Sequence, residues 1–427
     1  MIQVLMFGTL IALVMINVPI AVSLGVVAMG ALWYTYGFDN LVMSAVVLFE
    51  GATSFPLLAI PLFVLAGAIM NTSGISRRLI AFAAALVGFL RGGLSMVNIG
   101  TSLFFAEISG SAVADVAALG SILIPAMKRL GYSKEYAAAI TSSSASLAII
   151  IPPSIPMIPY AVIADASVVQ LFVAGIVPGL LGAIMMAALA YWFAVRYDFP
   201  VEETFQLRRV WRTFKEAAWA FLLPLIILGG IFGGFVTATE GAGLAVAAAL
   251  FIGGVIYREL SFRELFDSLR DGVIQTAVVM LLVATSALLG QYLTQARVPQ
   301  QLTQAIISVT ENPYAVLAML NLLFLVLGCF LHGAAAIILV VPIVMPIVHT
   351  IGIDPVHFGL IVTLNLAIGQ QTPPVASVLM TACSIAKADV WDVTKVNIAF
   401  IGVLAALLLL ITYVPPVSMT LVDIFYR

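Results

Sequence analysis

Apolar segments long enough to cross a membrane constrain the fold of this chain most. Residues 217–236, 272–293 and 398–413 contain no charged side chain, and they approach or exceed the roughly 20 apolar residues that a spanning helix needs. Of the 427 residues, 63% are hydrophobic and 9% are charged, whereas soluble domains have about 25% charged residues. The sequence therefore predicts an all-α, polytopic membrane protein.

The amino-terminal segment and the cysteines agree with this class. Residues 1–21 are apolar without Lys or Arg, so they lack the positive region of a cleavable signal peptide and are predicted to be the first span. Two cysteines, Cys329 and Cys383, both lie in apolar stretches and predict no disulfide framework.

The stretch "IIIPPSIPMIPYA" (149–161) places four prolines in an apolar environment. Proline removes a backbone donor and clashes with the preceding turn, so the helix must break here and free several carbonyls. Non-helical backbone at membrane depth is tolerated where protein buries it or where it lines a polar cavity. The break therefore indicates a binding site.

An internal repeat follows from the same prolines. Pro152-Pro153 recurs as Pro373-Pro374, and the same shift along the chain, here called the repeat offset, relates Pro125 to Pro346. With this offset, "SSSASLAIIIPPS" (142–154) matches "TLNLAIGQQTPPV" (363–375). We therefore divide the chain into repeat 1 (1–196), a basic cytoplasmic linker (197–216) and repeat 2 (217–427).

The distribution of positive charge predicts that the repeats are inverted. Lys and Arg collect on the cytoplasmic side of membrane proteins, and residues 298–355 hold none of them. If the repeats are inverted, as in many secondary transporters, equivalent loops lie on opposite sides of the membrane and differ in their content of Lys and Arg. The matching window, 77–134, holds six: Arg77, Arg78, Arg91, Lys128, Arg129 and Lys134.

A topology follows from this count. With 16 of the 18 Lys and Arg residues placed in the cytoplasm, only Arg297 and Arg427 lie outside, and both termini are predicted to be periplasmic. Segment 94–127 then enters and returns from one side, because limbs of about 14 residues reach only ~21 Å. We predict about ten spans, interfacial arm helices at 77–91 and 300–311, re-entrant hairpins at 94–127 and 314–349, and broken helices at 136–164 and 357–385.

The hairpin tips and broken helices are predicted to converge near the bilayer midplane. The first tip contains Ser109, Gly110 and Ser111, and the second contains Gly328, His332 and Gly333. Unwound carbonyls there could bind a cation, and half-helix amino termini could bind an anion. The candidate substrate-binding residues are Ser142, Ser144, Pro152, Pro153, Gln371, Thr372 and Pro373, and Asn365 and Gln370 belong to the same polar cluster.

Several of these residues also have a purely structural interpretation. Gly and Ser in membrane helices more often serve close packing. Ionisable groups in apolar segments are functional candidates by default, and Glu107 and Asp115 are of this kind. Glu107 could couple transport or could be a structural partner. We expect Asp165 to be solvated at a span end and Glu240 to mark a helix start.

Two other classes of function are compatible with parts of the sequence. Ser111 and His332 at opposing tips could form the nucleophile and base of an intramembrane hydrolase, but the sequence has no HExxH, Walker A or CxxC motif. A passive channel is disfavoured because proline-broken inverted hairpins suit alternating access. We therefore expect a carrier and no enzyme.

The quoted motifs carry a family resemblance. "GSAVADVAALGSILIPAMKRLGYSKEYAAAI", "IIPPSIPMIPYA" and "GIDPVHFGLIVTLNLAIGQQTPP" resemble the large membrane subunit of tripartite ATP-independent periplasmic (TRAP) transporters. The resemblance implies a bacterial inner-membrane secondary transporter of elevator type. It would take up organic acids such as a C4-dicarboxylate or sialic acid with a sodium gradient.

The resemblance also implies partners and ion sites. The partners are a small four-helix membrane subunit, a periplasmic substrate-binding protein and the lipid bilayer; neither nucleic acid nor any cofactor besides sodium ions is implied. Sodium site one would comprise Ser109, Gly110 and Ser111 with carbonyls from Ala148 to Ile151. Sodium site two would comprise Gly328, Gly333, Asn365, Gly369 and Thr372.

One residue departs from the family pattern. His332 stands at the second tip, where the family pattern has an acidic residue. Histidine is not a hard anionic ligand, but its pKa suits proton exchange. The second ion site and a proton-coupled alternative, with Glu107 and His332 as carriers, therefore stay open.

Overall fold

The computed structural model describes residues 2–16, 18–201 and 204–426, and this part of the chain is helical without any strand. Eight of its helices are long and apolar enough to cross a membrane. In a bilayer the helix is favoured because it satisfies every backbone donor and acceptor within one segment. The predicted all-α membrane class is confirmed.

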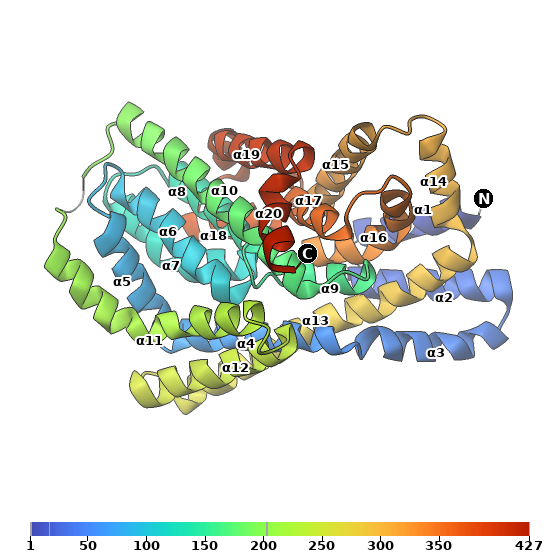
Figure 1. Cartoon of the computed structure of the whole chain (residues 1–427), viewed down its shortest axis with the longest axis horizontal. Helices are drawn as coiled ribbons and strands as arrows, with labels where there is room; N and C mark the ends of the chain where they lie inside the picture. The colour runs from blue at the N-terminus through green and yellow to red at the C-terminus, as the bar shows by residue number, and fades with distance from the viewer. Residues whose placement is uncertain (1, 17, 202–203, 427) are drawn as a thin grey trace.

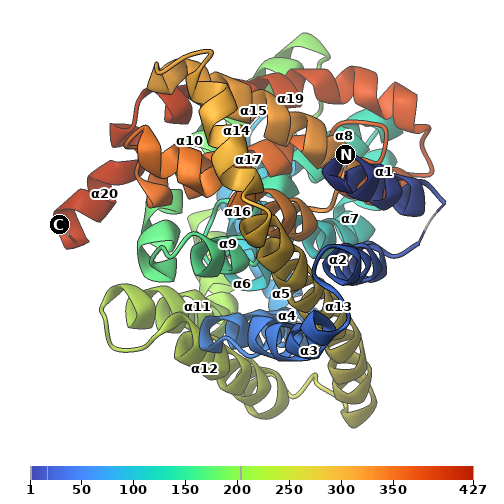
Figure 2. The same cartoon turned by 90° about the vertical axis from the view of Figure 1, so that its right-hand side faces the viewer.

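One side of the molecule is built from helices of both halves (Figures 1 and 2). The longest helix, α13, runs along α2, α3 and α4, and α12 packs on α4. Small residues allow this close approach, since a Cβ on Gly51 would lie 2.7 Å from the Ala287 side chain. The helices are α1 (Ile2–Met15), α2 (Ile20–Tyr36), α3 (Asp39–Ala52), η1 (Phe55–Leu58), α4 (Ala59–Thr72), α11 (Leu207–Phe232), α12 (Ala238–Phe251), η3 (Ile252–Ile256) and α13 (Phe262–Gln295).

The remaining helices occur in the same order in the two halves. Each half has a short helix, two helices joined by a tight turn, a helix that breaks at the double proline, and a long helix. In repeat 1 these are α5 (Ile75–Val87), α6 (Gly93–Ser109), α7 (Ala112–Arg129), α8 (Lys134–Ala145), η2 (Ser146–Ile149), α9 (Met157–Ile163) and α10 (Val168–Arg196). In repeat 2 they are α14 (Val298–Ile307), α15 (Pro313–Phe330), α16 (Gly333–Thr350), α17 (Pro355–Gly369), α18 (Ser377–Ala386) and α19 (Val390–Tyr413), followed by α20 (Pro416–Tyr426).

The hairpin limbs are longer than expected. They have 17 and 18 residues in repeat 1 and 18 and 18 in repeat 2, or about 27 Å at 1.5 Å per residue. Their length alone therefore does not distinguish the hairpin limbs from membrane-spanning helices. The prediction that they are re-entrant depends on the distribution of Lys and Arg. The segment 197–216 also differs from a simple linker, because α11 already begins at Leu207; residues 202–203 lie outside the described chain.

The first arm helix, α5, is held at its start by an ion-paired cluster. Arg78 donates to both oxygens of Glu259, in the loop between η3 and α13, at 2.8 and 3.2 Å, and stacks on the Tyr257 ring at 3.8 Å. The Arg78 guanidinium holds the pKa of Glu259 below its ordinary value. This cluster ties the beginning of α5 to the side of the molecule that contains α13.

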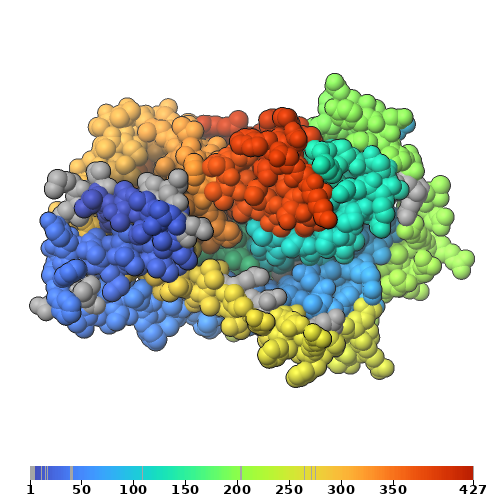
Figure 3. Space-filling view, turned by 180° about the vertical axis from the view of Figure 1, so that it is seen from behind, coloured from blue at the N-terminus to red at the C-terminus, as the bar shows by residue number. Residues whose placement is uncertain are grey.

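Contacts between the repeats continue on the back of the molecule. There α18 lies beside α7 (Figure 3). Lys128, at the end of α7, donates to the Ala386 carbonyl at the end of α18, at 3.0 Å. A positive group at a helix carboxyl terminus complements its partial negative charge, so this contact joins the first hairpin to the second broken helix.

Candidate functional site

Both predicted broken helices are interrupted at their double prolines. In repeat 1 the helix ends with η2 at Ile149 and resumes at Met157, and the Ser154 hydroxyl donates to the freed Ile149 carbonyl at 2.6 Å. In repeat 2, α17 ends at Gly369 and α18 begins at Ser377. The Pro152-Pro153 and Pro373-Pro374 bonds are both cis. Two unwound loops thus interrupt otherwise regular helices.

The first hairpin tip packs directly on the first loop. Gly110 is left-handed, with φ +58°, and its carbonyl accepts from the Ile155 amide at 3.2 Å. A Cβ at Gly110 would lie 2.4 Å from the Pro153 carbonyl oxygen. Only glycine fits this approach, because another residue would be both strained and obstructed.

The second tip has the equivalent relation to the second loop. The Val375 amide donates to the Cys329 carbonyl at 3.1 Å. Gly328 and Gly369 cross so closely that a Cβ on Gly369 would lie 2.4 Å from the Gly328 Cα. Each hairpin tip is therefore hydrogen-bonded to the loop of its own repeat.

A cavity of ≈ 40 Å³ lies where the two tips meet. Gly110 and Ser111 of the first tip and His332 of the second line it, with Ile149 and Gln370 from the two broken helices and Val279 from α13. Residues at the starts of α7 and α16, Ala112 and Ala334, complete part of its wall. The convergence of these segments, which come from both repeats, defines the candidate site.

Apart from Thr372, which is partly exposed, the other candidate ion-site residues are buried. Ala148 is 0% and Ile151 6% exposed. The hydroxyl of Ser109 donates to Asp115 and accepts from the Ser111 amide at 3.2 Å, which organises the first tip. Asp115 is fully buried, and its Oδ2 has no partner among the described residues.

Glu107, in the last turn of α6, is partly exposed, and His332, which lines the cavity, is exposed. No hydrogen bond between described residues joins His332 to Ser111. The pair therefore lacks the contact that a nucleophile and its base require.

The candidate substrate residues divide into two groups. Thr372 and Pro373 are partly exposed in the second loop, whereas Pro152 and Pro153 are buried under the first tip. The others are fully buried and bonded to protein: Ser142 to the Ala139 carbonyl, Ser144 to Asn98, and Gln371 to the Ser142 carbonyl and Ser146. Gln370, next to Gln371, is the residue of this pair that faces the cavity.

Two asparagines that the sequence did not predict at the site bind the broken helices. Asn98 of α6 donates to Thr141 at 2.6 Å and accepts from Ser144 at 3.1 Å. Asn321 of α15 accepts from Asn365 at 2.7 Å. Ser144 and Asn365 are related by the repeat offset. An asparagine at a similar position in the first limb of each hairpin was therefore the signal in the sequence that could have predicted these contacts.

Two acidic residues are placed as predicted, Glu240 at a helix start and Asp165 exposed after a helix end. Glu240 closes a capping box with Thr237, accepting from its amide at 2.8 Å. Asp165 is exposed just after α9 ends. Both residues are excluded from the candidate site.

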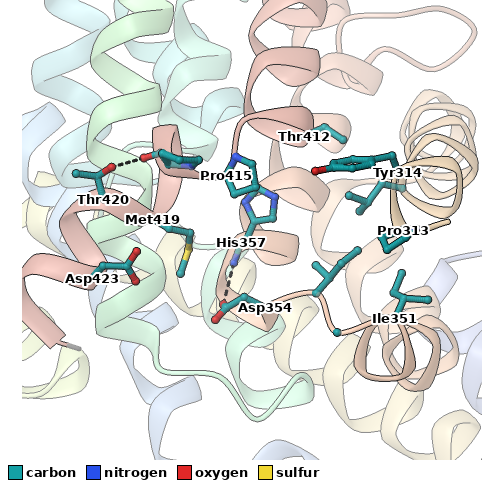
Figure 4. A pocket seen from close by; sticks show the side chains of 14 residues that line it. Pro313, Tyr314, Ile351, Asp354, His357, Thr412, Pro415, Met419, Thr420 and Asp423 are labelled. Atoms are coloured by element: carbon teal, nitrogen blue, oxygen red, sulfur yellow. Dashed lines mark hydrogen bonds between the residues drawn. The ribbon is translucent and has the colours of Figure 1, made fainter.

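A larger pocket, of ≈ 470 Å³, lies away from the tips, between the starts of α15, α17 and α20 (Figure 4). Asp354 on its wall caps α17, accepting from the Val356 amide at 2.7 Å, and the His357 ring bonds Ser418 at 2.8 Å. These polar groups stabilise helix ends and contacts, and we assign the pocket no function.

Comparison with known proteins identifies the family. Residues 7–417 match the family described as tripartite ATP-independent periplasmic transporter, DctM component. The chain belongs to this family. It is thus a multi-pass TRAP transporter permease and not an enzyme, which excludes the hydrolase alternative and confirms the resemblance in the sequence.

Curated relatives of this TRAP permease share much of its length. It is 36% identical to the C4-dicarboxylate TRAP transporter large permease protein DctM of Vibrio cholerae, over 97% of this chain and 96% of that protein. It is 35% identical to the sialic acid large permease SiaM of the same organism, with 98% of each covered. It is also 40% identical to the isethionate permease protein DctMQ of Oleidesulfovibrio alaskensis, of which it spans 65% while 97% of this chain is covered.

The fold has a more distant likeness among solved structures. The YdaH transporter of Alcanivorax borkumensis aligns with a TM-score of 0.60 at 14% identity, covering 89% of this chain and 90% of that one. At this identity the likeness concerns the fold alone.

Proposed function

We propose that this permease imports an organic acid across the bacterial inner membrane, driven by a sodium gradient. The relatives named above carry isethionate, C4-dicarboxylate or sialic acid in their names, and all three compounds are anions at neutral pH. A carboxylate such as a C4-dicarboxylate or sialic acid is the proposed substrate class, delivered by a periplasmic binding protein. Both termini would lie in the periplasm, and transport would follow an elevator mechanism.

The cavity between the hairpin tips is the observation that carries this proposal. Both α7 and α16 begin at its wall. Helix amino termini carry unpaired amides and partial positive charge, which favour a carboxylate. The cavity of ≈ 40 Å³ has room for only a few water molecules, so the substrate is proposed to bind between these two helix ends in a state in which the tips stand further apart.

We propose two sodium sites, one for each hairpin tip and the broken helix of its own repeat. Site one uses Ser109, Gly110 and Ser111 with carbonyls from Ala148 to Ile151. Site two uses Gly328, Gly333, Asn365, Gly369 and Thr372. Oxygen ligands from hydroxyls, amides and carbonyls suit a hard cation such as sodium.

The coupling is tested by uptake into proteoliposomes. With the small membrane subunit and loaded binding protein present, inward sodium is expected to be required for uptake of the organic acid. The measurement is the initial rate with sodium or choline outside. Undiminished uptake in sodium-free buffer across pH 6 to 8 would reject sodium coupling.

Proton coupling is the second candidate because His332 lines the cavity. In that case an inward proton gradient would suffice, and His332→Gln would abolish the pH dependence of uptake. Glu107, at the end of α6, is the second proposed carrier, and Glu107→Gln would test it in the same assay.

A membrane partner is also expected. The first helices expose large apolar side chains, including Trp33, Tyr34 and Phe38, and we propose that the small four-helix subunit covers part of this region. The two subunits should elute together from size exclusion in mild detergent. Separate elution, combined with full transport by this chain alone, would contradict the three-part assembly.

A further inference from the structure

A buried side-chain bridge joins the two broken helices across the repeats. The Gln371 amide nitrogen, in the second loop, donates to the Ser142 carbonyl at 2.7 Å and to the Ser146 hydroxyl. Its oxygen accepts from the Asn397 amide of α19 at 3.1 Å. Asn397 in turn accepts from the Ser143 hydroxyl at 2.6 Å, which closes the network.

The bridge is sealed from solvent. Gln371, Asn397, Ser143 and Ser146 are all 0% exposed. A buried polar network whose members are satisfied specifies one geometry, because any other arrangement leaves an unpaired group in a medium of low dielectric. This network can therefore hold the two loops in one relative position.

The bridge has no counterpart in the other half of the chain. The repeat offset maps Gln371 onto Ile150 and Asn397 onto Ile176, neither of which has a polar side chain. In contrast, the Asn98 and Asn321 contacts occur in both repeats, each within its own half. A contact required for the fold of a single repeat would be expected in both repeats. The bridge therefore fixes the position of one repeat relative to the other.

The position of the bridge relates it to the cavity. Gln370, adjacent to Gln371, and Ile149, in the same short helix as Ser146, both line the cavity. The bridge thus connects the two segments that carry these residues. Its members are fully buried and are not among the residues that line the cavity.

We propose that Gln371 and Asn397 are positioning residues that make the two walls of the cavity a single unit, so that a change at one loop is transmitted to the other. This inference rests on the proposed function only in taking the cavity as the substrate site. Neither residue is required to touch the substrate.

Hydrogen exchange tests whether the bridge couples the two loops, and it does not depend on a transport assay. In purified protein, Asn397→Ala should raise exchange in peptides covering 142–156 and 365–377 by roughly tenfold, the size expected when a buried hydrogen bond loses its partner. Ser286→Ala is the matched control, because Ser286 is buried but bonds only carbonyls of its own helix. Faster exchange confined to α19 in the Asn397 variant would overturn the proposal.

Uptake measurements test whether the bridge affects binding of the substrate. At matched amounts of folded protein, Asn397→Ala should raise the substrate concentration for half-maximal uptake about tenfold, with a smaller change in maximal rate. Ser143→Ala keeps the bond between Gln371 and Asn397 and should have a smaller effect; an equal effect of both variants would overturn the positioning role. Asn397→Ser replaces the alanine variant if that one does not fold.

The two experiments separate the proposals. If the unsubstituted protein takes up substrate without sodium, sodium coupling fails while the exchange result still decides the bridge. If uptake requires sodium and exchange in both loops is unchanged by Asn397→Ala, the bridge fails and the proposed function stands.

Discussion

Substitution of Gly110 by alanine is expected to reduce uptake below about a tenth of that of the unsubstituted protein. The left-handed backbone at φ +58° costs an L-residue roughly 1–2 kcal/mol. The new Cβ would also lie 2.4 Å from the Pro153 carbonyl oxygen, so the tip must move away from the first loop. The measurement is the initial uptake rate per folded transporter in proteoliposomes.

Gly100→Ala supplies the control for this prediction. Gly100 lies in α6, on the same hairpin, and a Cβ there would meet nothing within 4 Å. It should retain nearly full uptake, because alanine is the better helix former. Full uptake by Gly110→Ala would show that the contact between tip and loop does not shape the site.

Removal of the Asp115 carboxylate is expected to have an effect of similar size. Asp115 is fully buried and accepts from the Ser109 hydroxyl, and a buried polar group that loses its hydrogen-bond partner costs about 1–3 kcal/mol. Asp115→Ala should therefore lower uptake by ten- to a hundredfold or more. Thermal unfolding of the purified variant, measured beside uptake, reports whether the loss arises from misfolding.

Asp115→Asn distinguishes the two possible roles of this carboxylate. Asparagine keeps an acceptor for Ser109 but cannot ionise, so recovered uptake would indicate that positioning of the tip is the main role. Ser121→Ala on the same helix is the control, since the exposed Ser121 bonds only the Ala118 carbonyl. Uptake by Asp115→Ala equal to that of Ser121→Ala would contradict a role for Asp115.

Part of the candidate site could be predicted from the sequence. The breaks at Pro152-Pro153 and Pro373-Pro374 were predictable because two adjacent prolines remove successive backbone donors from a helix, whereas α7 accommodates the single Pro125. The tips were predictable from Gly and Ser between apolar limbs. The ion ligands stay predictions. Gln371 was predicted at the site, but its partners Ser142, Ser146 and Asn397 lie on other helices, two of them in the other repeat, and no local pattern pairs them.

The sequence by itself determined the class of this protein. Uncharged apolar segments require helices in a membrane, the motifs around Gly110 and Gln371 carry the family, and the internal repeat sets the order of elements. Only the tertiary structure decided which polar groups face the cavity. Gln370 and Gln371 are adjacent and chemically identical, yet one lines the cavity and the other is buried in the bridge, because the unwound backbone of the loop, which has no helical period, sets where each side chain points.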